Sequence, residues 1–497
     1  MCGQSVLMDI FSFLTTSFPF GTTVKILYVM IVAATIAVII HDKREPVKAL
    51  AWITVIALLP FAGIILYVVF GRNHRKEKLF NRKEIKDIEQ LERMCTEQLR
   101  QMADPDAKLR RAIADNRDII TLLLNNNKAV LTIRNRVKVL NNGKETFAAL
   151  LAALKSATES IHIEYYIFEN DRIGNKIARI LIEKARKGVE VRFVYDDVGS
   201  WGLKAKFTRT LRKAGVKVGC FMPVAFPWLT SSVNYRNHRK IVVVDGRVAF
   251  TGGLNIADRY MLRRGKNGLW RDTHLQIEGE AVATLQAVFV TDWYFVSKEQ
   301  LLDTQKYFPK QDVEEESPLQ IASSGPDSDW ASIMQAFFSA IVHAQRYIYI
   351  SSPYFLPNEA ILTALKVAAL SGIDVRLMIP SRSDSKIVYW ATRSYVSELI
   401  DAGINVYMYR KGFNHSKVIV IDGAFSAVGS ANMDVRSFED NFEVTAMMYD
   451  HRIARELETC FLQDLGHSTL ITRRMWDERP NLHAFYEAMS RLLSPLL

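Results

Sequence analysis

Two long apolar runs near the start of the chain are separated by a short polar stretch. The first, GTTVKILYVMIVAATIAVII at 21–40, has 20 residues and a single charge, Lys25. The second, ALAWITVIALLPFAGIILYVVF at 49–70, has 22 residues and no charge, and as a helix rising about 1.5 Å per residue it would be about 33 Å long. Both runs are long enough to cross a bilayer, where Pro60 in the second is tolerated. We therefore expect a transmembrane hairpin in the segment 1–83. A signal peptide followed by a buried helix is the alternative, but the basic leader and small-residue cleavage site that it requires are both missing.

Basic residues follow the second apolar run. The segment 71–83, GRNHRKEKLFNRK, contains six Lys or Arg and one Glu, a bias typical of the cytoplasmic side of a membrane. We expect the bulk of the chain to be cytoplasmic, although the connection 41–48, HDKREPVK, is also basic, so the contrast is one of degree. The cluster could equally bind anionic lipid head groups. Beyond it, helix-forming residues with scattered apolar positions predict a linker helix over 84–106.

The rest of the chain alternates apolar, β-branched runs with helical patterns, and it does so twice in the same order. The run SIHIEYYIF at 160–168 corresponds to YIYISSPYF at 347–355, and each is typical of a buried strand. Alternation of strand and helix predicts an α/β fold. We expect two tandem α/β units, 107–317 and 318–497, with mixed, largely parallel sheets that face each other.

A ten-residue motif is written once in each unit. NHRKIVVVDG occupies 237–246, within a wider motif region at 233–260, and NHSKVIVIDG occupies 414–423, within 410–437. In both copies Asp-Gly lies between two β-branched runs, which is a strong signal for a β-hairpin. The two matches are followed by the similar segments GGLN and GSAN and lie inside a wider repeat, so a chance match is excluded.

The predicted hairpins bring polar side chains together. His and Lys are two positions apart on a strand, so they point to the same face. A turn centred on Asp-Gly sets His238 opposite Gly253 and His415 opposite Ser430. We therefore expect two clusters: His238, Lys240, Gly253 and Asn255 in the first unit, and His415, Lys417, Ser430 and Asn432 in the second.

The aspartates of the motif lie at a different place. Asp245 and Asp422 are five residues beyond the lysines, roughly 16 Å along a strand at about 3.3 Å per residue. We expect them to shape the turn or to pair with a neighbouring cation, and not to touch substrate.

A His–Lys–Asn cluster suits phosphate chemistry. Lys and Asn donors, with backbone amides, can hold phosphate oxygens, a neutral His can attack phosphorus, and a second His can protonate the leaving oxygen. Each unit supplies one His, so both are required. Asp272 and Glu443 are candidate orienting acids for the imidazoles, and their pairing within or across units is open. We expect no metal and no cofactor, because Lys and Asn already supply the positive charge and donors.

Charge and cysteine content add two constraints. The formal net charge of +11 suggests acidic partners such as anionic lipid or nucleic acid. The positive charge is concentrated beside the second apolar run, which favours anionic lipid over nucleic acid as the partner. The four cysteines are far apart in the sequence and predict neither a zinc site nor a disulfide framework; they are Cys2, Cys95, Cys220 and Cys460.

With its paired H-x-K-x-x-x-x-D motifs, two N-terminal apolar runs, the basic GRNHRKEK and the GGLN and GSAN tails, the chain resembles the bacterial cardiolipin synthases of the phospholipase D superfamily. The resemblance implies phospholipase D-like units and a bacterial inner (plasma) membrane location with the catalytic part cytoplasmic. It also implies that the first-motif His is the nucleophile, here His238, with His415 as acid and base. The catalytic residues it implies are His238, Lys240, Asp245, His415, Lys417 and Asp422.

The resemblance also implies a reaction. A phosphatidyl group would pass from one phosphatidylglycerol to another through a phosphatidyl-histidine, giving cardiolipin and glycerol. Membrane phospholipids are the expected partners, phosphatidylethanolamine could replace one phosphatidylglycerol, and no nucleic acid is expected. The alternatives are a membrane-anchored hydrolase of phospholipid or nucleic acid phosphodiesters, and a non-catalytic lipid-binding anchor, against which the intact His, Lys and Asn argue. The sequence gives no indication of oligomeric state.

Overall fold

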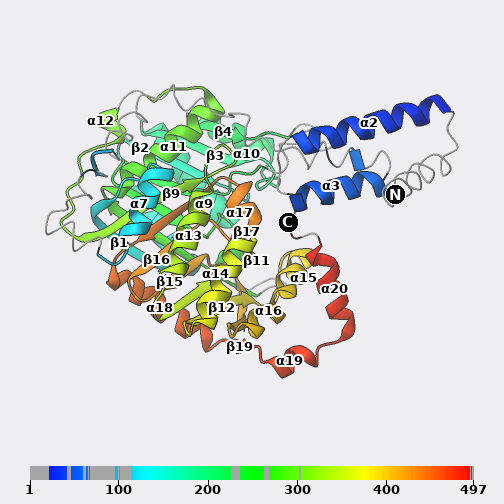
Figure 1. Cartoon of the computed structure of the whole chain (residues 1–497). Coiled ribbons are helices and arrows are strands. Elements are labelled where there is room, and N and C mark those ends of the chain that lie inside the picture. Colours follow the sequence, from blue (N-terminus) through cyan, green and yellow to red (C-terminus); the bar gives the residue numbers. More distant parts are fainter. Residues whose placement is uncertain are drawn as a thin grey trace. The chain divides into compact units, whose positions relative to one another are not determined.

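The computed structural model describes most of the chain (Figure 1). The described residues are 22–41, 46–59, 63–64, 67, 96–98, 100, 114–224, 235–261, 268–301, 304–492 and 494. They belong to two compact units, one formed by the described residues of 1–73 and the other by the described residues of 74–225 and 234–497.

The smaller unit contains two helices, α2 (Thr22–His41) and α3 (Pro46–Leu58). They pack together and bury Ile39, Trp52 and Ile56. Among the described residues, no helix is both long and apolar enough to span a membrane. Most of the predicted second helix beyond residue 59, the basic segment 71–83, and most of the predicted linker helix 84–106 lie outside the described residues.

The larger unit is an α/β fold whose first half precedes residue 316. Its strands are β1 (Thr132–Asn141), β2 (Ser160–Tyr165), β3 (Glu190–Asp196), β4 (Lys217–Phe221), β5 (Lys240–Val244), β6 (Val248–Gly252), β7 (Leu269–Arg271) and β8 (Thr273–Gly279). Its helices are α7 (Arg117–Asn126), α8 (Asn142–Ser156), α9 (Arg172–Arg186), α10 (Ala205–Lys213), the 3-10 helix η5 (Asp258–Tyr260), α11 (Ala281–Ser297) and α12 (Thr304–Tyr307).

The second half repeats this order. Its strands are β9 (Glu316–Ser324), β10 (Tyr347–Ser351), β11 (Phe355–Leu356), β12 (Asp374–Pro380), β13 (Asn405–Tyr409), β14 (Gly412–Asn414), β15 (Val418–Ile421), β16 (Phe425–Gly429), β17 (Met433–Asp434), β18 (Glu443–Met448) and β19 (Ser468–Leu470). Its helices are α13 (Ser332–Val342), α14 (Glu359–Leu370), α15 (Lys386–Ser394), α16 (Val396–Asp401), α17 (Val435–Glu439), α18 (His451–Leu465), α19 (Arg473–Asp477) and α20 (Asn481–Arg491).

One 15-stranded sheet runs through both halves. Outwards from β1 the first half has the order β1-β8-β6-β5-β2-β3-β4, and outwards from β9 the second half has β9-β18-β16-β15-β10-β12-β13, with β19 at the edge. The order is the same in both halves, and they join where β1 pairs antiparallel with β9. The duplication seen in the sequence is therefore a duplication of topology.

The sheet is mixed, as predicted, but the expectation of largely parallel sheets that face each other is wrong. Within the described part of the large sheet, parallel pairs occur only among β2, β3 and β4 and among β10, β12 and β13. These strands are the ones joined by crossover helices, whereas the motif hairpins and the strands that flank them pair antiparallel. The halves also join edge to edge, because β1 and β9 are neighbours in one continuous sheet.

Helices cover both faces of this sheet (Figure 1). In the first half, α8, α9 and α10 enclose one core with the sheet, and α11 lies on the opposite face. On the second half, α13 and α14 pack on one face together with α7, which precedes β1 in the chain, and α18 packs on the other. Helix α11 also contacts β9, and α18 also contacts β1. Each half therefore contributes a helix that crosses the join and stabilises it.

Both predicted motif hairpins form, β5 with β6 and β15 with β16. Their Asp-Gly pairs adopt positive φ, +52° and +62° in the first and +56° and +66° in the second, which Asp and Gly tolerate better than most residues. The predicted register is off by one position, because the loop has three residues: Val244 pairs with Val248, and Ile421 with Phe425. The predicted positions of His238 opposite Gly253 and of His415 opposite Ser430 are therefore wrong by one residue.

Candidate active site

Each motif histidine is held by the half to which it does not belong. The backbone N–H of His238 donates to the carbonyl of Phe442 at 2.9 Å, and that of His415 donates to the carbonyl of Arg271 at 2.7 Å. The short strand β14, just before His415, also pairs parallel with β7 of the first half. These backbone contacts bring the two motifs to the join between the halves.

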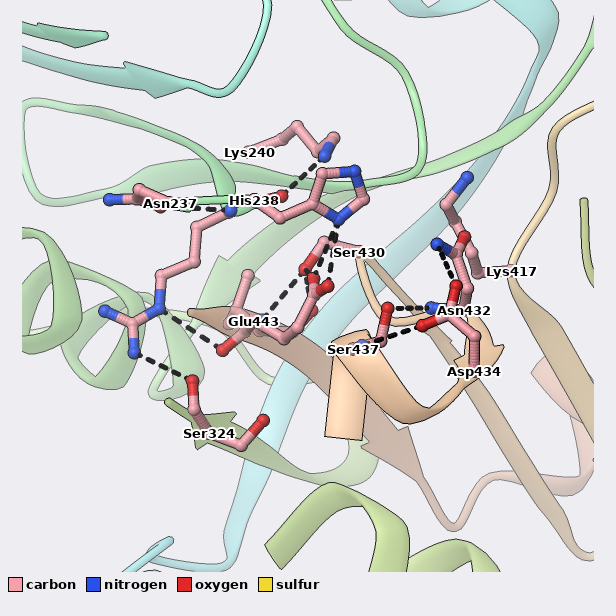
Figure 2. Close-up of polar contacts among 12 residues, drawn as sticks. Asn237, His238, Lys240, Ser324, Lys417, Ser430, Asn432, Asp434, Ser437 and Glu443 are labelled. Carbon is pink, nitrogen blue, oxygen red and sulfur yellow. Dashed lines mark hydrogen bonds and ion pairs between the residues drawn. The ribbon is translucent and has the colours of Figure 1, made fainter. Parts of the chain in front are cut away.

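The orienting acids pair across the halves. Nδ1 of His238 lies 2.9 Å from a carboxylate oxygen of Glu443 (Figure 2). Nδ1 of His415 lies 2.7 Å from a carboxylate oxygen of Asp272. The sequence left this pairing open, and the structure places both acids on the other half. Each imidazole is thereby oriented with Nε2 turned away from its acid.

The motif lysines lie beside these histidines. Nζ of Lys240 donates to the carbonyl of His238 at 2.5 Å, and Nζ of Lys417 lies 3.1 Å from Nε2 of His415. Burial lowers the pKa of Lys240 to about 7 and that of Lys417 to about 8. Burial, together with the positive charges of Lys417 and Lys240, also lowers the pKa of His415. The four side chains therefore share one electrostatic environment, which is rich in positive charge and suits an anionic phosphodiester.

Burial keeps both imidazoles neutral near pH 7. It lowers the pKa of His238 to about 4 and that of His415 well below its usual value. Their acids differ. Burial raises the pKa of Asp272 to about 7, whereas the pKa of Glu443 is lowered, because the hydrogen bonds from His238 and Ser430 and the positive charge of Lys240 outweigh its burial.

One sequence difference between the copies contributes to this asymmetry. The second copy has Ser430, whose hydroxyl donates a hydrogen bond to Glu443 and favours the ionised form of that carboxylate. The first copy has Gly253 at that position, and a Cβ there would lie 2.1 Å from a carboxylate oxygen of Asp272. Gly253 therefore leaves room for Asp272 but offers it no side-chain hydrogen bond.

The two motif asparagines lie beside the site with protein partners. Asn255 donates to the hydroxyl of Tyr260 at 2.9 Å and accepts from the N–H of Ile167 at 3.2 Å. Asn432 donates to Asp434 at 3.1 Å. Each amide group still has one N–H that these bonds do not use.

Asp245 and Asp422 lie at the far ends of their strands and bind backbone. The carboxylate of Asp245 accepts from the N–H groups of residues 158, 159 and 160, each at 2.8 Å. That of Asp422 accepts from the N–H groups of residues 345, 346 and 347. Each aspartate thus ties the hairpin turn to the start of a neighbouring strand, β2 or β10.

Replacing Asp422 by Ala is expected to lower stability by about 1–3 kcal/mol, since three N–H groups lose a charged acceptor. Thermal denaturation measures the change, and Asp245→Ala is the matched variant in the first half. Asn in place of Asp tolerates positive φ and should lose less. Both Ala variants should retain measurable catalysis well below their melting temperatures. A variant that melts like the native chain and is inactive would instead place the carboxylate in the reaction.

Some residues at the site were not singled out from the sequence. The ring of Tyr166 packs edge-on against His238 with centroids 4.9 Å apart, and Trp270 lies 5.2 Å from the ring of His415. Asn237 and Asn414 immediately precede the histidines, and the side-chain oxygen of each accepts the N–H two residues later at 3.1 Å. The signal for these asparagines was present, because they are the first letter of the repeated motif.

The chain resembles known proteins in sequence and in structure. The family described as "Cardiolipin synthase, PLD-like domain" matches residues 150–293 and 337–465, and the family described as "Phospholipase_D-nuclease N-terminal" matches 29–72. The cardiolipin synthase of Alkalihalophilus pseudofirmus is 44% identical over 482 residues, which are 96% of this chain and 94% of that protein. The major cardiolipin synthase of Bacillus subtilis is 41% identical over 475 residues, 95% of this chain and 98% of that protein.

A solved structure supports the fold alone. The phosphatidylserine synthase of Haemophilus influenzae superposes with a TM-score of 0.58 at 12% identity, over 78% of this chain and 100% of that one. The match shows that the two chains share an α/β fold over that part of this chain.

Proposed function

The chain belongs to the bacterial cardiolipin synthases of the phospholipase D superfamily and is a phosphatidyltransferase, and we propose that it joins two phosphatidylglycerol molecules into cardiolipin, with release of glycerol. The observation that carries the proposal is the meeting of two His–Lys pairs, each with an acid from the opposite half. Two imidazoles around one phosphodiester can divide the work of nucleophile and acid–base catalyst.

In the first step, Nε2 of His238 attacks the phosphorus of one phosphatidylglycerol. Glu443 accepts a hydrogen bond from Nδ1–H, which leaves the lone pair on Nε2 and stabilises the cation that forms on attack. The bond between phosphorus and the glycerol oxygen breaks, and the His415–Asp272 pair gives that oxygen a proton. The products are glycerol and a phosphatidyl group bound to His238.

In the second step, a head-group hydroxyl of another phosphatidylglycerol attacks the same phosphorus. His415 takes the hydroxyl proton, the phosphorus–nitrogen bond breaks, and cardiolipin leaves with His238 restored. The reaction breaks one phosphodiester bond and forms another, so its free-energy change is small and it is reversible. Lys240 and Lys417 stabilise the negative charge on the phosphate oxygens in both steps.

The asymmetry of the acids supports this assignment of roles. Glu443, with its lowered pKa, remains ionised and suits the partner of a nucleophile. Asp272 has a pKa of about 7, so its pair with His415 retains a proton part of the time near neutrality. A pair that gains and loses a proton in this range suits the acid–base role.

The proposal places the reaction at the cytoplasmic face of a bacterial membrane. It takes the N-terminal unit as the anchor, which the apolar sequence of α2 and the family match over 29–72 support. The basic segment 71–83 supports a cytoplasmic body.

The test uses purified full-length chain in mixed micelles with phosphatidylglycerol alone. We expect cardiolipin and glycerol in equal amounts by mass spectrometry, without added nucleotide or metal. Phosphatidic acid as the main product would mean that water is the second nucleophile, and the chain would then act as a hydrolase. Added phosphatidylethanolamine tests whether that lipid can replace one of the two substrates.

A further inference from the structure

The C-terminal helix α20 packs against the body mainly along one face, and Tyr486 at the border of that face also contacts Trp390 of α15, with ring centroids 5.4 Å apart. His483, Glu487 and Arg491 follow one another at four-residue intervals on that face. The ring of His483 lies 4.9 Å from Trp390 of α15, and Arg491 bonds to Glu398 of α16. Helices α15 and α20 accordingly lie side by side (Figure 1).

The other face of α20 is apolar and exposed to solvent. Its large side chains recur at helical spacing, and α15 adds one more beside them. They are Leu482 (57% exposed), Phe485 (58%), Tyr486 (41%), Met489 (50%) and Leu492 (73%), with Ile387 (48%) from α15. A continuous stripe of this size on a helix marks a site of interaction.

The two helices that carry the stripe contain more basic than acidic residues. The sequences of α15 and α20 contain one acid between them, Glu487, which is 3% exposed and bonded to Arg393 and Arg479. The exposed charges of the two helices are the cations Lys386 and Arg491, of which Arg491 is paired with Glu398 of α16. An apolar stripe with cations at its sides suits an anionic lipid surface better than a neutral protein partner.

The stripe is also connected to the catalytic groups. Helix α15 begins two residues after Asp384, which accepts a hydrogen bond from Tyr354 at 2.8 Å and interacts electrostatically with Lys417. Thr392 of α15 accepts the N–H of Phe355 in β11, and β11 pairs with β17, immediately after Asn432. The element that carries Ile387 therefore rests on the edge of the active site.

We propose that the stripe of Leu482, Phe485, Tyr486, Met489, Leu492 and Ile387 docks on an anionic phospholipid bilayer and holds the active site at the lipid head groups. The inference rests on the proposed function, because it takes the substrates to be bilayer lipids. It adds a membrane contact within the catalytic body to the one expected from the N-terminal unit.

The first test places an environment-sensitive nitrobenzoxadiazole label at Met489→Cys. The label is put on the full-length chain with its four native cysteines replaced by serine, reconstituted in phosphatidylglycerol-containing vesicles. We expect a blue-shifted emission and at least twofold quenching by a nitroxide attached to the lipid acyl chains. Leu370→Cys is the matched control, since Leu370 is an apolar side chain 73% exposed at the end of α14, and it should show neither effect.

Absence of lipid quenching at Met489→Cys would overturn the proposal. A blue shift without quenching that grows with protein concentration would show that a second copy covers the stripe. A blue shift without quenching that is independent of concentration would assign the stripe to another segment of the same chain.

The second test needs no label. The triple variant Leu482→Ser, Phe485→Ser and Met489→Ser should reduce transfer at least tenfold on phosphatidylglycerol in vesicles. It should stay within about twofold of the native chain on short-chain phosphatidylglycerol dissolved as monomers. Equal losses on both substrates, or no loss on vesicles, would contradict docking. If the native chain fails on both substrates as well, the proposed function fails instead.

Discussion

In the His415→Asn protein, we expect conversion of phosphatidylglycerol to cardiolipin to fall by about 10³-fold or more, while the first chemical step survives on an activated substrate. Phosphatidyl-p-nitrophenol has a leaving group that departs without a proton, so it does not need the acid. It should therefore release one equivalent of p-nitrophenolate per active site in a burst. The phosphatidyl group should then remain on the chain, because His415 is missing as the base for the second step.

The matched variant is His238→Asn, which removes the nucleophile. We expect no burst and no covalent adduct, and a loss of transfer on the order of 10⁵-fold. Stopped-flow absorbance measures the burst, and peptide mass spectrometry locates the phosphatidyl group on His238. If His238→Asn gives the burst and His415→Asn does not, the two roles are reversed. If neither variant gives it, the division of labour proposed here is wrong.

Local sequence rules account for the clusters within each half. A two-residue spacing sets His and Lys on one face of a strand, and Asp-Gly between β-branched runs makes a hairpin. The distance along the strand also predicts that Asp245 and Asp422 lie away from the His–Lys clusters. In the structure their carboxylates accept hydrogen bonds from backbone N–H groups. None of these inferences needs contacts between residues that are distant in the sequence.

The features that the sequence did not predict correctly depend on such distant contacts. The parallel pairing of β7 with β14 and the bond from His238 to Phe442 join segments more than 140 residues apart. No local propensity specifies them, so the sequence left open whether Asp272 and Glu443 act within or across halves. The antiparallel majority of the sheet was missed for a similar reason, because alternation of strand and helix does not report how the intervening hairpins pair.

Because each acid pairs with the histidine of the other half, we expect replacement of either acid to have a comparably large effect. In Glu443→Gln and in Asp272→Asn, we expect kcat to fall by about 10³–10⁴-fold with KM little changed. The amide can donate to Nδ1 and so stabilise the imidazole tautomer that carries its proton on Nε2. Steady-state kinetics on phosphatidylglycerol measures the loss, and circular dichroism checks that the fold persists.

A more specific expectation is that each acid variant loses the same reaction step as the variant of the histidine that it contacts. Because Glu443 orients His238, Glu443→Gln should slow the p-nitrophenolate burst, although Glu443 belongs to the other half. Asp272→Asn should keep the burst and lose the second step, as His415→Asn does. Double variants extend the argument: Asp272→Asn should add little to His415→Asn, since the two residues act as one unit. Acid variants that instead resemble the histidine of their own half would show that each half works by itself. In that case the pairing across the join would not operate during the reaction.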